Sequence, residues 1–460
     1  MCGVEVEIEG RDVVSVRGDE TDVFSKGHIC PKATALKDLY DDPDRLKQPV
    51  RRVGDRWEPI SWDEAFNEVA DRIHEIQLAH GRDSVGVYLG NPNAHNFGTM
   101  VFGPPFLRTL GSKNRFSATS CDQLPLMMAS YLMFGHQLMF PVPDIERTDF
   151  MMILGGNPLA SNGSIMAGPG IKKRLQAISK RGGKLVVVDP RRSETARIAD
   201  EHVFIKPGTD ALFLLGLLHE LVASGTNLGR LADSMKNVDR VLKVAKRYPP
   251  AQTEAVTGVA AETVKRLAGE LRAAPSAALY GRMGTSTQEF GSLCMWLINV
   301  INAVTGNLDE PGGSMFSTPA IDVLNAAGGF GAGRGSFGRW KSRVRGLPEF
   351  GGELPSAVIA EEILTEGEGQ IRAMITLAGN PVLSTPNGGR LDEAYASLDF
   401  AVSIDFFINE TSRHANIILP PVSPLERSHY DLARYLTAVR TVANYSPAPF
   451  DAEDGHLDVW

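Results

Sequence analysis

The chain has 460 residues, of which 43% are hydrophobic and 22% are charged. These fractions are those of an ordinary globular protein, and they exclude disorder and a coiled coil as the organisation of the whole chain. Lys and Arg number 47 against 55 Asp and Glu, a net charge of -8, so the basic surface of a nucleic-acid-coating protein is not expected. The longest apolar stretches, such as 211–218 and 295–304, are too short for a membrane span.

Cysteine is rare, and its positions are Cys2, Cys30, Cys121 and Cys294. Four cysteines in a chain of this length do not make a disulfide framework, which favours a reducing compartment or metal binding. No signal peptide is recognisable, so we expect a cytoplasmic protein, with the periplasm as an open alternative. Gly (46) and Pro (28) are abundant without a repeat period, which predicts many tight turns around bulky ligands.

The first elements predict a β-hairpin followed by a loop. Apolar and acidic residues alternate over 4–9, and a second short strand is expected at 13–16 after a turn. A Gly-containing loop then leads to Cys30, and the polar residues from about 38 to 58 are typical of a linker.

The next elements alternate between helix and strand. Ser61 and Glu64 form the pattern of a capping box, which predicts a helix that ends at Gly81. Its apolar face is expected to carry Phe66, Val69, Ile73 and Ile76. Residues 84–89 are typical of a buried strand. Because this alternation recurs along the chain, the expected class is α/β.

An internal repeat is the most informative feature of the middle of the chain. Two apolar runs each lead into a Gly-Asn-Pro turn, at residues 156–158 and 379–381. Each copy continues through a helix-like segment to a buried strand that ends in an aspartate, Asp189 or Asp405. In the twelve residues from each aspartate, Asp, Glu, Thr, Arg and Ala recur at identical offsets.

The repeat predicts two strand–loop–helix units. Turns at the carboxyl ends of parallel strands let backbone N–H groups approach a phosphate, and the aspartate after the next strand can bind a ribose or a base. Two units therefore suggest two similar nucleotide-bearing ligands. The alternative is an old structural duplication in which Gly-Asn-Pro is only a turn. No Gly-Lys-Ser/Thr and no Gly-x-Gly-x-x-Gly accompanies these turns, which disfavours an NTPase and an ordinary NAD dehydrogenase.

Several short motifs occur in order from Cys2 to about Glu426. In that order they resemble the molybdenum or tungsten oxidoreductases that carry two molybdopterin guanine dinucleotides, such as formate dehydrogenases and nitrate reductases. The motifs are Cys2-Gly3, Cys30-Pro31-Lys32, Gly155-Gly156-Asn157-Pro158, Asp189-Pro190-Arg191, Glu194-Thr195-Ala196, Lys206-Pro207-Gly208-Thr209-Asp210, Thr305-Gly306-Asn307-Leu308, Pro311-Gly312-Gly313 and Glu410-Thr411.

The resemblance implies a domain organisation. We expect a small N-terminal β-hairpin iron–sulfur domain, of which residues 1–50 are the remnant, followed by two pseudo-duplicated Rossmann-like α/β domains. One would comprise 51–115 plus 345–460 and the other 116–344, each binding one guanine dinucleotide. The family's last domain, which closes over the pterins, is expected to be absent, and residues 458–460 read as the start of a helix.

The resemblance also implies a [4Fe–4S] cluster. Cys2 and Cys30 match its third and fourth ligands, and since a four-iron cluster needs about four thiolates, we expect a chain truncated at its start. Lys32 would lie between the cluster and a pterin.

The metal ligand implied by the resemblance is Cys121, which is therefore the candidate catalytic residue. A soft thiolate suits molybdenum or tungsten. The alternative is a small buried thiol, which is the expectation for Cys294. The further implied cofactor-binding residues are Gly155, Gly156, Asn157, Asn162, Asp189, Arg191, Gly208, Asp210, Met283, Gly379, Asn380 and Asp405.

Departures from the family pattern leave the substrate open. Formate dehydrogenases carry His directly after the ligating cysteine, where this sequence has Asp122. Their Arg-Gly-Gln-Asn segment is also missing from residues 328–340, although Arg334 and Arg339 lie there. The expected function is two-electron redox chemistry on a small substrate, with electrons passing through the cluster to a partner protein.

Three alternatives remain at this point. They are a formate dehydrogenase proper, a redox-relay or scaffold subunit of the respiratory complex I type without a metal site, and non-redox chemistry at tungsten of the acetylene hydratase kind.

Overall fold

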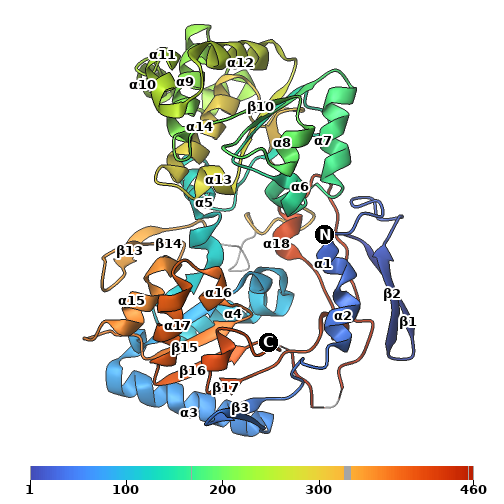
Figure 1. Cartoon of the computed structure of the whole chain (residues 1–460), viewed down its shortest axis with the longest axis vertical. Helices are drawn as coiled ribbons and strands as arrows, with labels where there is room; N and C mark the ends of the chain where they lie inside the picture. Colours follow the sequence, from blue (N-terminus) through green and yellow to red (C-terminus); the bar gives the residue numbers. More distant parts are fainter. Residues whose placement is uncertain (1, 167, 326–332, 454, 459–460) are drawn as a thin grey trace.

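The computed structural model describes residues 2–166, 168–325, 333–453 and 455–458. Figure 1 shows two α/β bodies, one above the other, with the N-terminal hairpin beside them. Parts of two sequence-based interpretations, the segment 328–340 and the helix expected at 458–460, lie outside the described residues. Among the described helices none is both long and apolar enough to cross a membrane.

The first body is built on a four-stranded parallel sheet with the order β10-β9-β8-β11. Its strands are β8 (Phe150–Leu154), β9 (Lys184–Val188), β10 (Glu201–Val203) and β11 (Ala277–Gly281). The helices of this region are α5 (Leu124–Phe134), α6 (Pro158–Ser161), α7 (Ile171–Lys180), α8 (Glu194–Ile198), α9 (Asp210–Ala223), α10 (Val238–Ala245), α11 (Pro250–Thr257), α12 (Ala261–Ala273), α13 (Met283–Ser286) and α14 (Gly291–Val304).

Both faces of this sheet are buried, which explains why its strands read as continuous apolar runs. Met152 and Leu154 of β8 pack with side chains of α9, α12 and α14 on one face. Met151 and Ile153 point to the opposite face, where they pack with Leu175 of α7 and its neighbours.

The second body is built on a seven-stranded sheet with the order β4-β3-β17-β16-β15-β5-β6. Its strands are β3 (Val50–Val53), β4 (Arg56–Pro59), β5 (Val85–Leu89), β6 (Arg115–Ser117), β15 (Ala373–Leu377), β16 (Phe400–Ile404) and β17 (Ile417–Ile418). All neighbours from β17 to β6 pair in parallel, whereas β3 and β4 are antiparallel.

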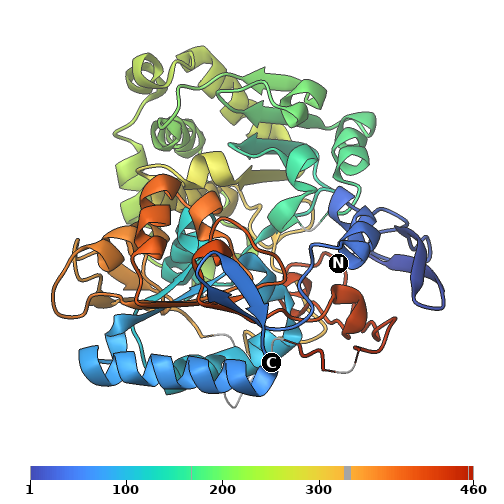
Figure 2. The ribbon, with the colours of Figure 1, turned by 60° about the horizontal axis from the view of Figure 1, so that its bottom comes forward.

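Helices cover both faces of the second sheet as well. Figure 2 shows α3 (Trp62–His80) along one side of its strands and α15 (Ile359–Leu364), α16 (Pro381–Ser384) and α17 (Gly388–Ala396) along the other. Ile73 and Ile76 of α3 pack against Val85 and its neighbours. Beyond β5, the 3-10 turn η2 (Asn91–His95) leads into α4 (Phe97–Leu110).

The two sheets share one spatial arrangement of parallel strands around β8 and β15, although the order in which the chain supplies them differs. After β8 the chain adds β9 and then β10 on one side, and β11 later returns to the other side of β8. After β15 it adds β16 and β17 on one side, and β5 occupies the other. The strand order therefore reverses at β8 and at β15, and in open α/β sheets ligands bind at the carboxyl ends of strands at such a switch point. The expected pair of Rossmann-like α/β units is confirmed.

The N-terminal hairpin, β1 (Val4–Glu9) with β2 (Asp12–Gly18), is followed by α1 (Pro31–Thr34) and α2 (Leu36–Asp41). This region contacts the C-terminal segment, where Phe24 packs on Tyr435 of α18 (Leu432–Tyr435). The buried Glu426 carboxylate accepts hydrogen bonds from Arg11 (3.1 Å) and Arg45 (3.4 Å). Two further short strand pairs are β7 (Val142–Pro143) with β12 (Ser314–Met315), which lies beside β11, and β13 (Phe337–Lys341) with β14 (Pro348–Phe350).

The expected hairpin and the capping box of Ser61 and Glu64 are confirmed. The expected linker at 38–58 is wrong, because it contains the end of α2 and the strands β3 and β4, which extend the sheet beyond β17. β4 pairs with its neighbour β3, but β3 pairs with β17, more than 350 positions away, and no local pattern reveals that pairing. Phe66 also differs from expectation: it is 47% exposed and lies against Trp62 rather than in the core.

Candidate cofactor and active site

The first Gly-Asn-Pro turn follows β8 and is tied to the start of α8 by one side chain. Asn157 Nδ2 donates to Glu194 Oε2 at 2.6 Å, while Asn157 Oδ1 accepts from Thr195 Oγ1 at 2.8 Å. Thr195 Oγ1 in turn accepts from Leu159 N at 3.2 Å. The recurring Asn, Glu and Thr thus have a structural reason, because together they fix the turn against the helix that follows the next strand.

The second turn follows β15 and repeats this network. Asn380 Nδ2 donates to Glu410 Oε2 at 2.6 Å, and Asn380 Oδ1 accepts from Thr411 Oγ1 at 2.8 Å. Thr411 Oγ1 accepts from Val382 N at 3.1 Å. The backbone angles also match, with φ -126° and ψ 72° at Asn157 and φ -124° and ψ 69° at Asn380. The internal repeat is therefore a structural repeat at the level of single hydrogen bonds.

Each turn bends through a left-handed residue. Gly155 has φ 53°, and Ala378 occupies the same place in the second copy with φ 46°. Gly155 also lies so close to α13 that a Cβ atom there would be 2.4 Å from Thr285 N. Gly156 and Gly379 follow as the second residue of each turn. Both turns therefore present backbone at the switch point of their sheet, where a phosphate is commonly held.

The two predicted aspartates close similar turns after β9 and β16. Asp189 Oδ1 accepts from Arg191 N at 2.7 Å, and Asp405 Oδ1 accepts from Phe407 N at 3.2 Å. Burial raises the pKa of Asp405, although backbone N–H groups and Asn409 oppose the rise. Arg191 also pairs with Glu194 at 3.2 Å, which connects the aspartate turn to the Asn157 network.

Further predicted residues gather around the first turn. Asp210 begins α9 and is buried, and Gln288 Nε2 donates to its carboxylate at 2.9 Å. Burial raises the pKa of Asp210, and the charge of Asp189 adds to the rise, so the two carboxyl groups are neighbours. Met283 begins α13 and is 41% exposed. Gly208 (φ 79°) and Asn162 (φ 51°) are left-handed turn residues, and Asn162 ends α6.

Cys121 lies at the end of the 3-10 turn η3 (Ala118–Cys121). Its Sγ is 3.1 Å from Ser356 Oγ, and Ser356 also contacts Ser120 Oγ at 2.9 Å. The next residue, Asp122, forms an ion pair with Arg282 at 2.9 Å. Arg282 follows β11 directly, so this ion pair joins η3 to the carboxyl edge of the first sheet.

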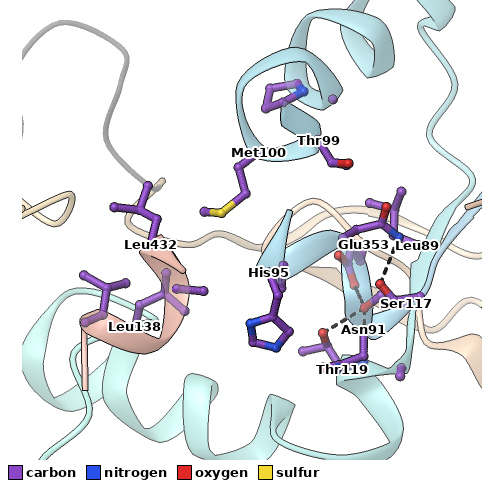
Figure 3. A pocket seen from close by; sticks show the side chains of 18 of the residues that line it. Leu89, Asn91, His95, Thr99, Met100, Ser117, Thr119, Leu138, Glu353 and Leu432 are labelled. Carbon is purple, nitrogen blue, oxygen red and sulfur yellow. Dashed lines mark hydrogen bonds between the residues drawn. The ribbon is translucent and has the colours of Figure 1, made fainter. Parts of the chain in front are cut away.

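A cavity of about 740 Å³ opens beside these residues, between the two bodies and the C-terminal segment. Residues that precede and follow Cys121 in the sequence line this cavity, namely Thr119, Asp122 and Gln123. On the β6 side, Ser117 Oγ donates to Glu353 Oε2 at 2.5 Å, as Figure 3 shows. Burial raises the pKa of Glu353, and the bond from Ser117 only partly opposes this.

Comparison of the sequence with protein families identifies the family to which this site belongs. Residues 45–441 match the family described as Molybdopterin oxidoreductase, which is most of the chain. The chain belongs to the molybdopterin oxidoreductase family.

Individual molybdopterin oxidoreductases are similar to it over nearly its whole length. Formate dehydrogenase H of Escherichia coli is 25% identical over 92% of this chain. The assimilatory nitrate reductase catalytic subunit of Bacillus subtilis is 26% identical over 87% of it. The chain spans 61% and 58% of these two proteins.

A solved structure supports the fold. The acetylene hydratase of Pelobacter acetylenicus superimposes with a TM-score of 0.79 over 100% of this chain and 66% of its own, at 20% identity. The comparison shows that the two-body α/β architecture described above occurs in a solved protein.

In the N-terminal region the structure brings two of the predicted residues together. Cys2 and Cys30 are neighbours: burial raises the pKa of Cys2, the Cys30 thiol adds to the rise, and the Cys30 backbone hydrogen-bonds the Cys2 sulfur. Lys32 lies exposed on α1. In the described part of the chain, no three His, Cys, Asp or Glu side chains gather as a metal site. The predicted roles of Cys2, Cys30 and Lys32 stay predictions.

Two other expectations concern single residues. Cys294 is confirmed as a core residue of α14: its exposed fraction is 0%, and burial raises its pKa to about 12. Arg339 pairs with Glu349 at 2.8 Å on the β13–β14 hairpin, so it is a structural residue there.

Several residues of the cavity wall were not predicted from the sequence, among them His95, Arg282, Glu353 and Arg434. Arg282 had a signal, because it follows a buried strand at the edge where ligands bind. His95 and Glu353 lie in irregular segments far apart in the sequence, so no period or motif marks them.

Proposed function

We propose that this chain binds two molybdopterin guanine dinucleotides and one molybdenum or tungsten ion, and supports two-electron chemistry on a small substrate. The observation that carries the proposal is the pair of matching hydrogen-bond networks at Asn157 and Asn380. Two turns of the same geometry, each at a switch point, suit two copies of one phosphate-bearing ligand.

The residues around the first turn fit a polar ligand. Thr285 Oγ1 and Gln288 Oε1 are buried and have no hydrogen-bond partner within the described ranges. Thr285 lies against Gly155, and Gln288 contacts Asp210. Buried polar atoms are nearly always paired, so a ligand with donors and acceptors is expected beside α13. Asp189 and Asp210 would accept from its base and ribose donors, and Asp405 would do so for the ligand of the second turn.

Cys121 is proposed as the protein ligand of the metal. When bound, the metal–pterin group supplies the electron transfer, and this chain's residues orient the substrate and supply or remove protons. Cys2 and Cys30 are proposed as two ligands of a [4Fe–4S] cluster, with Lys32 beside the electron route and a partner protein as the electron acceptor or donor. Formate and nitrate, which appear in the names of the two similar enzymes, are the first substrates to test.

The cofactor count tests this proposal directly. Protein purified from a molybdopterin-producing host should release about two GMP per metal on hydrolysis. Asn157→Ala should lower the count towards one, because it unties only the first turn, while Asn416→Ala is a matched control outside both networks. A count of one in the wild type contradicts the proposal of two sites.

Substitution of Cys121 tests the metal ligand. Cys121→Ala should abolish viologen-coupled turnover and remove one sulfur at about 2.3–2.4 Å from the metal's X-ray absorption spectrum, by analogy with other metal–thiolate bonds. Cys294→Ala is the control, with activity intact and a stability loss of about 1–2 kcal/mol. An unchanged sulfur count in Cys121→Ala contradicts the assignment. Nucleotide without metal in the wild type would instead indicate a relay or scaffold subunit.

A further inference from the structure

His95 ends η2, the short turn between β5 and α4, and its imidazole is held by a carboxylate. His95 Nδ1 lies 3.1 Å from Asp431 Oδ1, on the segment that leads into α18. Because an ionised carboxylate only accepts hydrogen bonds, Nδ1 is the donor in this pair. In the neutral ring the proton then sits on Nδ1, and Nε2 is the free acceptor.

The other end of the ring faces the cavity. His95 Nε2 has no hydrogen-bond partner among residues of the described ranges, and the ring is part of the cavity wall. Figure 3 shows it projecting between Leu138 and Leu432 on one side and Ser117 and Glu353 on the other. A ligand in the cavity can therefore reach Nε2 without any rearrangement of the Asp431 contact.

Asp431 is itself fixed in place. It is 7% exposed, and its Oδ1 also accepts from Arg434 N at 3.0 Å, which caps α18. Burial works to raise the pKa of Asp431, but the hydrogen bond and charge of His95, together with Arg434 N–H, outweigh it and lower the pKa. Asp431 is therefore an ionised orienting group, as in carboxylate–histidine pairs that position a proton-transferring imidazole.

The charges facing this part of the cavity favour an anion. Arg108 and Arg434 line the cavity, and no ion pair with a carboxylate is formed by either side chain in the described part of the chain. Asp122 is already paired with Arg282 at 2.9 Å. Burial raises the pKa of Glu353, which favours its neutral form, and burial lowers the pKa of the nearby His429. The unpaired guanidinium groups leave the cavity with a surplus of positive charge.

We propose that His95, oriented by Asp431, is the catalytic proton-transfer residue for a small carboxylate or oxyanion bound in this cavity. The inference rests on the proposed function, which brings the substrate there. In the protonating direction the Nε2–H bond breaks and an O–H bond forms on the anion. The electron pair of the broken bond stays on nitrogen, so the imidazolium becomes neutral imidazole and no electrons are exchanged in this step.

Turnover of the loaded full chain tests the proposal with formate and nitrate as the probes, coupled to viologen dyes. His95→Gln should lower kcat about 100-fold with KM changed less than about threefold, a usual size for losing a general acid or base. Imidazole in solution should restore part of the kcat of His95→Ala, which a purely structural role would not allow. His74→Gln, on the exposed side of α3, is the matched control and should leave kcat unchanged.

A second measurement is independent of activity. ¹⁵N NMR of the full chain at pH 8.5 should report His95 as the Nδ1–H tautomer. Asp431→Ser keeps an N-cap but withdraws the carboxylate, so it should shift His95 to the Nε2–H tautomer.

The outcomes separate the two proposals. Wild-type turnover with unchanged kcat in His95→Gln, or an Nε2–H tautomer in the wild type, overturns the role of His95 alone. Absence of wild-type turnover with both anions, in protein that releases two GMP per metal, overturns the role of His95 towards such anions and leaves the cofactor proposal standing, whereas protein without metal and nucleotide overturns the proposed function itself.

Discussion

Glu353 illustrates how one carboxyl group can couple the cavity to stability. The cavity wall buries it, and among the described residues only Ser117 Oγ donates to it, so its pKa is raised. A folded-state pKa above the unfolded value of about 4.3 means that the folded protein holds the proton more tightly. The stability that this group contributes is thus full below pH about 4.3 and is lost as the pH rises through the raised value.

We expect Glu353→Gln to remove this loss, because the amide stays neutral and its oxygen can still accept from Ser117. Relative to wild type, the variant should gain on the order of 1 kcal/mol of unfolding free energy between pH 4.5 and pH 8 in urea titrations. Glu410→Gln is the opposite control: Asn380 and the backbone lower the pKa of Glu410, so this variant should lose stability as the pH rises above 4.5. Equal pH slopes for both variants would contradict the argument.

At the scale of an element, the two strand–turn units differ at one informative position. Gly155 and Ala378 hold the same left-handed place, but only alanine has a Cβ that makes this conformation unfavourable. The second unit therefore carries a backbone strain that the first one lacks.

The two positions predict opposite effects of exchanging their residues. Ala378→Gly should stabilise the protein by about 0.5–1 kcal/mol, since relief of the left-handed strain exceeds the entropy that glycine adds to the unfolded chain. Gly155→Ala should cost at least about 2 kcal/mol, because its Cβ would be 2.4 Å from Thr285 N. Thermal unfolding of both variants checks this, and a destabilised Ala378→Gly would show that the second turn is unstrained.

These units also show what a sequence can predict. The repeat was detectable because each unit is local: a Gly-Asn-Pro turn, a helix, a strand and an aspartate lie within about 40 residues, at offsets that copy across the chain. The strands β3 and β4 were missed because β3, which carries β4 at its edge, pairs with β17 at the other end of the sequence. Both strands lie at the edge of the sheet and are mostly polar, so they lack the alternation of apolar residues that predicts a strand.

At the scale of the whole molecule, the candidate site is assembled from separate places. The motifs identified the turns and Cys121, but the cavity wall combines η2, η3, the residues after β11 and β14, and α18. Such a wall depends on how two sheets and a C-terminal segment are placed, and that placement follows from tertiary packing. The sequence therefore predicted the two Gly-Asn-Pro turns better than the groups that line the cavity.

The interrupted second sheet has a consequence for synthesis on the ribosome. β5 ends at Leu89, and its partner β15 begins at Ala373, about 280 residues later. At a translation rate of about 5–20 residues per second, β15 is synthesised roughly 15 to 60 s after β5. The four-stranded body, whose strands all lie between 150 and 281, can fold meanwhile. Proteolysis of stalled nascent chains of increasing length should find 150–281 protected before 62–117. Simultaneous protection of both segments would mean that β5 is covered before β15 is made, for example by a chaperone.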